Sequence, residues 1–146
     1  KGESGNVMVV DDYAHHPTEV RATLAAARNG WKRRIIAVFQ PQLYTRTQAF
    51  YQDFALAFME SDILVVTDVF PAREEPIEGV NGKMVADFAE ELGHRNIHYI
   101  QSLDKLEKTL DNLRQPGDMI ITIGAGNIWR YADNYMNHLE KIEAAA

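Results

Sequence analysis

Short apolar runs of strand length recur along the chain and alternate with segments of helical spacing. The runs are rich in Val and Ile and carry few polar residues on either face, which is typical of strands covered on both sides of a sheet. They occupy residues 7–10, 34–39, 63–67, 97–100 and 119–123.

Between these runs, apolar residues recur at intervals of three and four, which predicts amphipathic helices. The apolar stripes lie within residues 20–27, 50–58, 84–92, 103–113 and 128–139. Pro17 suits a first helical turn, and Ser102 can cap the fourth helix. Strands that alternate with helices predict an α/β fold, a three-layer sandwich around a mainly parallel sheet of about five to six strands.

Composition narrows the possible partners. The 146 residues suit one domain, and 15 Lys and Arg against 21 Asp and Glu give a formal net charge of −6. The positive residues are scattered, which argues against nucleic acid and anionic membranes as partners. The absence of cysteine excludes disulfides, thiolate metal sites and cysteine nucleophiles. No apolar run approaches the roughly 20 residues of a membrane span, and we expect a cytoplasmic protein.

The two ends of the chain differ from its middle. The chain begins with Lys1 and continues through Gly2, Ser4 and Gly5, a composition typical of a linker. We therefore expect residues 1–6 to be a linker, the chain to be an excised piece of a longer protein, and residues 141–146 to be a helical tail.

Candidate chemistry is found where the predicted strands end. Ligands of open parallel sheets bind beyond the carboxyl ends of the strands, because loops converge there and helix N-termini point their N–H groups at the crevice. Four of the five strand exits are polar, long or rich in glycine, and we expect them to form one surface. These exits are residues 11–17, 40–47, 68–76 and 124–127.

The first exit offers acids and histidines. Asp11 and Asp12 are candidates for a metal site or a general base, but neighbours on an extended segment point to opposite faces, so at most one faces a given ligand. A turn acid and a helix-capping acid explain them equally well. His15 and His16 are consecutive and cannot easily share a metal, so we expect no metal site.

The other exits are each open to two interpretations. Gly124-Ala125-Gly126 is half of a dinucleotide-binding fingerprint or a tight turn with close helix packing. Arg46, with the hydroxyls of Tyr44, Thr45 and Thr47 beside it, can hold a carboxylate or phosphate, or it is a solvated arginine at a helix start. The chain has no G-x-x-x-x-G-K-[ST] phosphate loop.

Together, the four exits resemble a known family. DDYAHHPTEV, FQPQLYTRT, VFPAREEPIEG and GAGNI, in this order, are similar to the C-terminal domain of the Mur ligases, and within them to the branch that joins L-alanine to UDP-N-acetylmuramate. The resemblance covers residues 9–132 and implies a Rossmann-like fold. It divides the chain into a linker from an upstream domain (1–6), a Mur ligase C-terminal domain (7–140) and a tail (141–146).

The resemblance also implies a reaction. In this family ATP, with Mg²⁺ held mostly by a central domain, phosphorylates the muramoyl carboxylate, and the amine of L-alanine attacks the acyl phosphate during peptidoglycan synthesis. The third domain closes over the site. The partners implied are the N-terminal and central domains of the same chain, ATP, L-alanine and UDP-N-acetylmuramate. This chain would hold no catalytic residue and would be inactive alone.

Position by position, the resemblance assigns Asp12 to the ATP ribose, and Tyr13 and His15 to the nucleotide site. Arg46 matches the arginine that holds the carboxylate of the amino acid.

The remaining substrate-side positions follow from the same motifs. Tyr44 lies beside Arg46, and Glu74 and Asn127 match polar positions that face the same cleft. Gln42 stands where the family commonly has His, so it can form hydrogen bonds but offers no cationic contact.

Three alternatives remain at this stage, and one of them is a stand-alone interaction module with no ligand. A related recycling ligase adds a tripeptide to the same sugar and shares the D-D-[YF]-A-H-H-P element. A phospho-acceptor receiver domain would use the acids of VMVVDDY and Asp68, although receivers need a lysine where this chain has Gly124-Ala125-Gly126.

Overall fold

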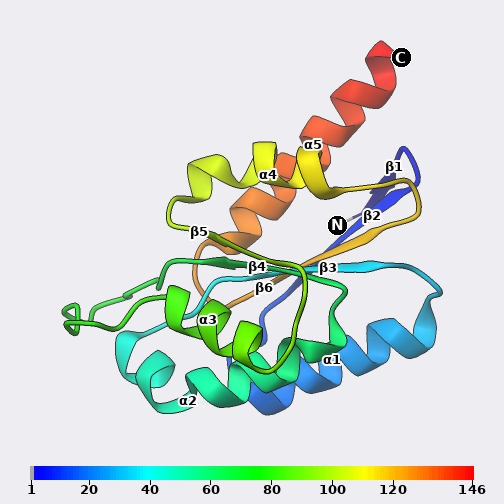
Figure 1. The fold of residues 1–146 in the computed structure, drawn as a ribbon. Coiled ribbons are helices and arrows are strands. Elements are labelled where there is room, and N and C mark those ends of the chain that lie inside the picture. Colours follow the sequence, from blue (N-terminus) through cyan, green and yellow to red (C-terminus); the bar gives the residue numbers. More distant parts are fainter. Residues whose placement is uncertain (1) are drawn as a thin grey trace.

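A single six-stranded sheet runs through the computed structural model, which describes residues 2–146 (Figure 1). The strands lie in the order β1-β2-β6-β3-β4-β5. All neighbouring strands are parallel except β1 and β2, so the predicted mainly parallel sheet is confirmed. The strands are β1 (Gly2–Ser4), β2 (Val7–Asp12), β3 (Ile35–Phe39), β4 (Ile63–Thr67), β5 (Ile97–Ile100) and β6 (Met119–Ile123).

Helices cover both faces of this sheet, which confirms the three-layer sandwich. On one face lie α1 (Pro17–Gly30), α2 (Tyr44–Ala57) and α3 (Lys83–Glu91), and on the other lie α4 (Leu106–Leu113) and α5 (Ile128–Ala145) (Figure 1). Short 3₁₀ helices, η1 (Phe58–Glu60) and η2 (Leu103–Lys105), precede β4 and α4. No helix among residues 2–146 is long and apolar enough to cross a membrane.

The continuous apolar runs follow from this double cover. Every residue of β3 is buried, and its side chains alternate between two cores. Ala37 and Phe39 join the core under α1–α3, whereas Ile36 and Val38 join the core under α4 and α5. A strand buried on both faces cannot alternate apolar with polar residues, which is why the sequence shows runs instead.

The chain ends depart from the expected division. Residues 2–4, expected within a linker, form β1, which pairs antiparallel with β2, while Lys1 lies outside the described residues. Gly5 and Asn6 have φ values of 57° and 61° and form a two-residue hairpin loop, which needs a left-handed backbone at both positions. Glycine therefore serves a tight turn here. At the other end, α5 continues to Ala145.

Strand order excludes the receiver alternative. Taken along the chain, the five parallel strands occupy the spatial order 1-5-2-3-4, because β6 inserts between β2 and β3. Receivers have the flavodoxin-like order 2-1-3-4-5. The receiver alternative is therefore wrong. The helix that follows β6 covers the face opposite the helices that follow β2 and β3 (Figure 1), and ligands of open α/β sheets bind beyond the carboxyl ends of the strands at such a switch point.

Candidate functional site

The loops that follow β3 and β4 are joined by backbone hydrogen bonds at the carboxyl edge of the sheet. The Leu43 N–H donates to the Phe70 carbonyl at 2.9 Å, and the Phe70 N–H donates to the Pro41 carbonyl at 2.8 Å. The second of these loops, residues 68–82, projects from that edge (Figure 1). Its first residues are therefore held against the start of α2.

Arg46 lies in the first turn of α2, directly beyond the exit of β3. Its Nη1 donates to Gln42 Oε1 at 3.4 Å, a long hydrogen bond across one turn. The side chain is half-buried, and residues 2–146 offer its guanidinium no other hydrogen bond. Arg46 therefore keeps most of its donors available at this edge of the sheet.

Glu74 reaches from the projecting loop to the N-terminus of α2. Its Oε1 accepts from the Thr45 N–H at 3.1 Å and its Oε2 from the Thr45 hydroxyl at 2.5 Å. The Thr45 hydroxyl, backbone N–H groups of Thr45 and Tyr44, and the charge of Arg46 together lower the pKa of Glu74. Leu43, which precedes α2, provides no side-chain cap, so a residue distant in sequence caps this helix.

Asn127 and the glycine pair form a packed junction with β3. Gln40, only 3% exposed, donates through Nε2 to Asn127 Oδ1 at 2.6 Å and accepts the Ile128 N–H at 3.0 Å. A Cβ added at Gly126 would lie 2.6 Å from Phe70 Cγ. Gly126 thus packs closely against the exits of β3 and β4, which supports the interpretation of the glycine pair as a tight turn.

Asp11 and Asp12 point to opposite faces of β2, as expected for neighbours on a strand. Asp11 Oδ1 accepts from the Thr122 hydroxyl of β6 at 2.7 Å. Asp12 accepts the Ala14 N–H at 2.8 Å through one oxygen and the Thr23 hydroxyl at 2.9 Å through the other. Asp12 thus connects the β2 exit to α1, and the two carboxylates bind different partners.

The rest of the β2 exit carries aromatic rings. Tyr13 is 68% exposed, and its ring meets the His15 ring edge-on at a centroid distance of 5.7 Å. Glu19 accepts the N–H groups of His15 and His16, and these hydrogen bonds, that of His15 foremost, lower the pKa of Glu19. The exposed ring of Tyr13 is available for stacking.

The structure gathers the predicted residues into two groups at one edge of the sheet. The substrate-side residues Gln42, Tyr44, Arg46, Glu74 and Asn127 come from the exits of β3, β4 and β6. The nucleotide-side residues Asp12, Tyr13 and His15 follow β2. The exits of β2 and β6 are joined by a backbone hydrogen bond, in which the Gly124 N–H donates to the Asp12 carbonyl at 3.1 Å. The His16 ring also contacts Phe50 of α2, at 6.1 Å between ring centroids.

An open hollow of about 620 Å³ lies between the first turn of α1 and the middle of α2. His16 and Glu19 line it from the side of α1, and Phe50 and Asp53 from the side of α2. The hollow therefore separates the helix that follows the nucleotide-side residues from the helix that carries Arg46.

Sequence reasoning gave Gln40 no role and named Thr45 only for its hydroxyl beside Arg46, whereas both residues hold the predicted residues in place. Their position in the sequence was the one indication of these roles, because both residues lie within the polar segment that follows β3. Neither role shows in the sequence, since the partners of these residues are 87 and 29 positions away.

A titratable cluster that the sequence did not suggest joins α4 to α5. Glu107, Asp111 and His138 bring their ligand atoms within 4.8 Å of one another. His138 Nε2 lies 2.8 Å from Asp111 and Nδ1 lies 3.3 Å from Glu107, while Arg114 Nε lies 3.4 Å from Asp111. Both ring nitrogens already face carboxylates and a guanidinium adds positive charge, so the cluster fits a helix-to-helix contact better than a cation site.

Comparisons with known proteins agree with this architecture. The family model described as Mur ligase, glutamate ligase domain, matches residues 1–126. The UDP-N-acetylmuramate–L-alanine ligase of Salinibacter ruber is 51% identical over 96% of this chain, and that of Syntrophus aciditrophicus is 48% identical over 98%. The chain spans 30% of the length of each of these relatives.

Solved structures share the fold at lower identity. A murein peptide ligase from Psychrobacter arcticus superposes with a TM-score of 0.77 at 23% identity, covering 95% of this chain and 28% of that one. A folylpolyglutamate synthase/dihydrofolate synthase from Yersinia pestis gives a TM-score of 0.60 at 14% identity, covering 90% and 28%. Because the family model matches most of the chain and the relatives match nearly all of it, the chain belongs to the Mur ligase family and corresponds to its C-terminal, glutamate ligase domain.

Proposed function

We propose that this chain is the closing domain of an ATP-dependent ligase that joins L-alanine to UDP-N-acetylmuramate through an acyl phosphate, in cytoplasmic peptidoglycan synthesis. The observation that carries the proposal is Arg46, whose guanidinium is held at the exit of β3 by one long bond to Gln42. A planar guanidinium can bind a carboxylate through two parallel hydrogen bonds, which aims the amine of an amino acid at the acyl phosphate.

The amino acid is proposed from the relatives. The ligases of Salinibacter ruber and Syntrophus aciditrophicus, at 51% and 48% identity, are named for L-alanine. The murein peptide ligase is 23% identical, which supports a shared fold and nothing finer. This difference favours L-alanine over the tripeptide of the recycling ligases.

The nucleotide would lie against the β2 exit. Asp12 is proposed to accept hydrogen bonds from the ribose hydroxyls, with Tyr13 and His15 beside the nucleotide. Mg²⁺ and the phosphates of ATP would be held mostly by the central domain, since this chain has no phosphate loop. The chain alone should therefore release no ADP when it is given UDP-N-acetylmuramate and L-alanine.

The partners proposed for this domain are the N-terminal and central domains of the same chain. Around Arg46, the residues Gln42, Tyr44, Glu74 and Asn127 are proposed to shape the amino-acid side of the closed cleft. Gln42 supports orientation of the substrate through Arg46 without adding charge, because an amide oxygen accepts from the guanidinium.

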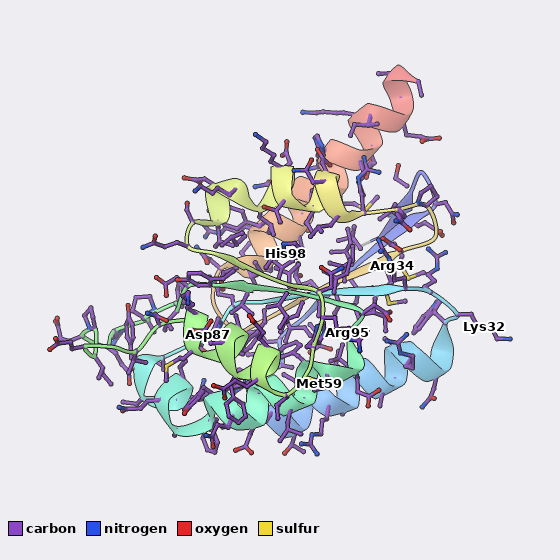
Figure 2. The ribbon with its side chains drawn as sticks, viewed as in Figure 1. Lys32, Arg34, Met59, Asp87, Arg95 and His98 are labelled. Carbon is purple, nitrogen blue, oxygen red and sulfur yellow. The ribbon has the colours of Figure 1, made fainter. Side chains whose placement is uncertain are left out.

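Substitution of Arg46 in the full-length ligase tests the proposal. Arg46→Ala should lower kcat/KM for L-alanine by roughly 30- to 1000-fold, and Arg46→Lys should recover only part, because one point charge replaces two directed bonds. The KM for ATP should change far less. Arg95→Ala is the matched control, because Arg95 is exposed on the connection between α3 and β5 (Figure 2). A wild-type kcat/KM for L-alanine in Arg46→Ala would refute the assignment.

A further inference from the structure

Glu74 contacts the helix that carries Arg46 rather than Arg46 itself. Both oxygens of the Glu74 carboxylate are bound to Thr45, one to its N–H and one to its hydroxyl. Thr45 directly precedes Arg46 in the first turn of α2. We infer that Glu74 is a positioning residue, which fixes the first turn of α2 and thereby the direction of the Arg46 side chain. This inference rests on the proposed carboxylate-binding role of Arg46.

The start of α2 needs such a partner. The first N–H groups of a helix have no acceptor within the helix, and a Ser, Thr, Asp or Asn before the helix usually supplies one. The preceding residue here is Leu43, which has no polar side chain and whose φ is 69°, an unfavourable backbone for a residue with a Cβ. Glu74 supplies the missing acceptor from a loop 29 residues away.

The loop is built to present Glu74 at this place. The Glu74 N–H donates to the Pro71 carbonyl at 2.9 Å, which closes a turn in which Ala72 has a φ of 55°. The base of the loop is fixed as well, because Asp68 Oδ1 accepts the N–H groups of Val69 and Gly82. These hydrogen bonds fix both the turn at residues 71–74 and the base of the loop, and they therefore restrict the position of the Glu74 carboxylate beside α2.

The charge of Glu74 has a second consequence. Arg46 lies close enough to lower the pKa of Glu74 together with the stronger bonds from Thr45, so Glu74 stays ionised in the closed loop. A carboxylate that bound Arg46 directly would compete with the substrate carboxylate. Because both oxygens of Glu74 bind Thr45, the carboxylate does not occupy the guanidinium donors of Arg46, which stay available to the substrate.

Three variants separate these effects. Glu74→Ala removes the acceptor, Glu74→Gln keeps an acceptor without the charge, and Glu75→Ala changes the neighbouring exposed acid, which has no described contact with α2. Amide hydrogen exchange of Thr45, measured by NMR on the 146-residue chain, reports the contact itself. We expect exchange about 10-fold faster in Glu74→Ala, within about 3-fold of wild type in Glu74→Gln, and unchanged in Glu75→Ala.

Kinetics of the full-length ligase report the consequence for the substrate. Glu74→Ala should raise the KM for L-alanine by about 10-fold, with kcat and the KM for ATP within about 2-fold of wild type, and Glu74→Gln should restore most of the KM. A merely structural role would not confine the change to one substrate.

Each contrary result has its own meaning. Wild-type exchange at Thr45 in Glu74→Ala would overturn the contact, and a wild-type KM for L-alanine beside fast exchange would overturn the positioning role. A loss of kcat at an unchanged KM would mean that Glu74 acts on the reacting groups. A wild-type ligase without L-alanine turnover would overturn the proposed function alone, since the exchange result does not depend on activity.

Discussion

Gln40 and Asn127 are joined by a side-chain hydrogen bond of 2.6 Å, although they stand 87 positions apart. The same Gln40 amide accepts the Ile128 N–H at 3.0 Å and so caps α5. One buried side chain therefore sets the position of α5 relative to the exit of β3. Of the substrate-side residues, Asn127 is held at this junction.

Replacing Gln40 should reveal the strength of this junction. Gln40→Ala leaves the Ile128 N–H and Asn127 without their partner and opens a cavity, so the free energy of unfolding should fall by about 2–3 kcal/mol. Urea denaturation measures the change. Gln48→Ala, at an exposed position of α2, should stay within about 0.5 kcal/mol of wild type. An equal fall in the free energy of unfolding of the two variants would show that the contacts of Gln40 add no stability.

Gly126 should tolerate no side chain. A Cβ there would lie 2.6 Å from Phe70 Cγ and 2.7 Å from Gln40 Oε1, so Gly126→Ala should lower the free energy of unfolding by about 1–3 kcal/mol. Gly30→Ala is the matched control, because nothing lies within 4 Å of a Cβ at Gly30. Thermal melting of both variants decides the matter. An unchanged Tm for Gly126→Ala would contradict close packing at this glycine.

Asp12 has both a structural bond and a proposed ribose contact, and these can be separated. In the full-length ligase, Asp12→Ala should raise the KM for ATP by roughly 10- to 100-fold, because hydrogen bonds to a charged group are strong. Thr23→Val removes only the bond from α1 to Asp12 Oδ2 and should leave this KM within about 3-fold. Similar increases in both variants, confirmed as folded by melting, would make Asp12 purely structural.

Acid should weaken the contact between α4 and α5. Burial alone raises the pKa of Asp111, but the hydrogen bonds from Tyr135 and His138 outweigh it and bring the pKa below the ordinary value of 3.8. A lowered pKa in the folded state stabilises the protein above the unfolded value, and this contribution is lost as the pH falls through the lower, folded value.

The pH dependence of unfolding tests this contact. The wild type should lose about 0.5–1 kcal/mol more than Asp111→Asn between pH 6 and pH 3, a small difference because the carboxylate is partly exposed. Urea denaturation across this range supplies the values. Glu140→Gln, at an exposed position on α5, should follow the wild type. If the free energy of unfolding fell equally with pH in wild type and Asp111→Asn, the Asp111 carboxylate would make no contribution to the pH dependence.

The two ends of the sheet carry different arginines, and Figure 2 shows one of these ends. Lys32 and Arg34 lie at the end opposite the 68–82 loop, where Arg34 binds both oxygens of Asp118, at 2.9 and 2.6 Å. Asp118 is 2% exposed, so this pair holds the amino edge of β3 and β6 together. The two arginines therefore differ: Arg34 is paired with a buried carboxylate, whereas Arg46 keeps most of its guanidinium donors available.

The sequence by itself determined the local structure. The apolar runs at 63–67, 97–100 and 119–123 became strands with these bounds, because a strand covered on both faces must be apolar throughout. The run at 7–10 was extended to Asp12, since Asp11 and Asp12 pair with Thr122 and Ile123 of β6. The helical stripes were equally readable, because burial of one helix face repeats every three to four residues.

Only the tertiary structure decided which elements meet. Apolar runs do not encode their neighbours, so the insertion of β6 between β2 and β3, and the pairing of residues 2–4 as an edge strand, were not predicted. The motif exits indicated that Arg46, Glu74 and Asn127 gather at one edge. That Glu74 binds Thr45 and that Asn127 binds Gln40 depends on contacts 29 and 87 residues apart, which form only once the sheet has brought the loops together.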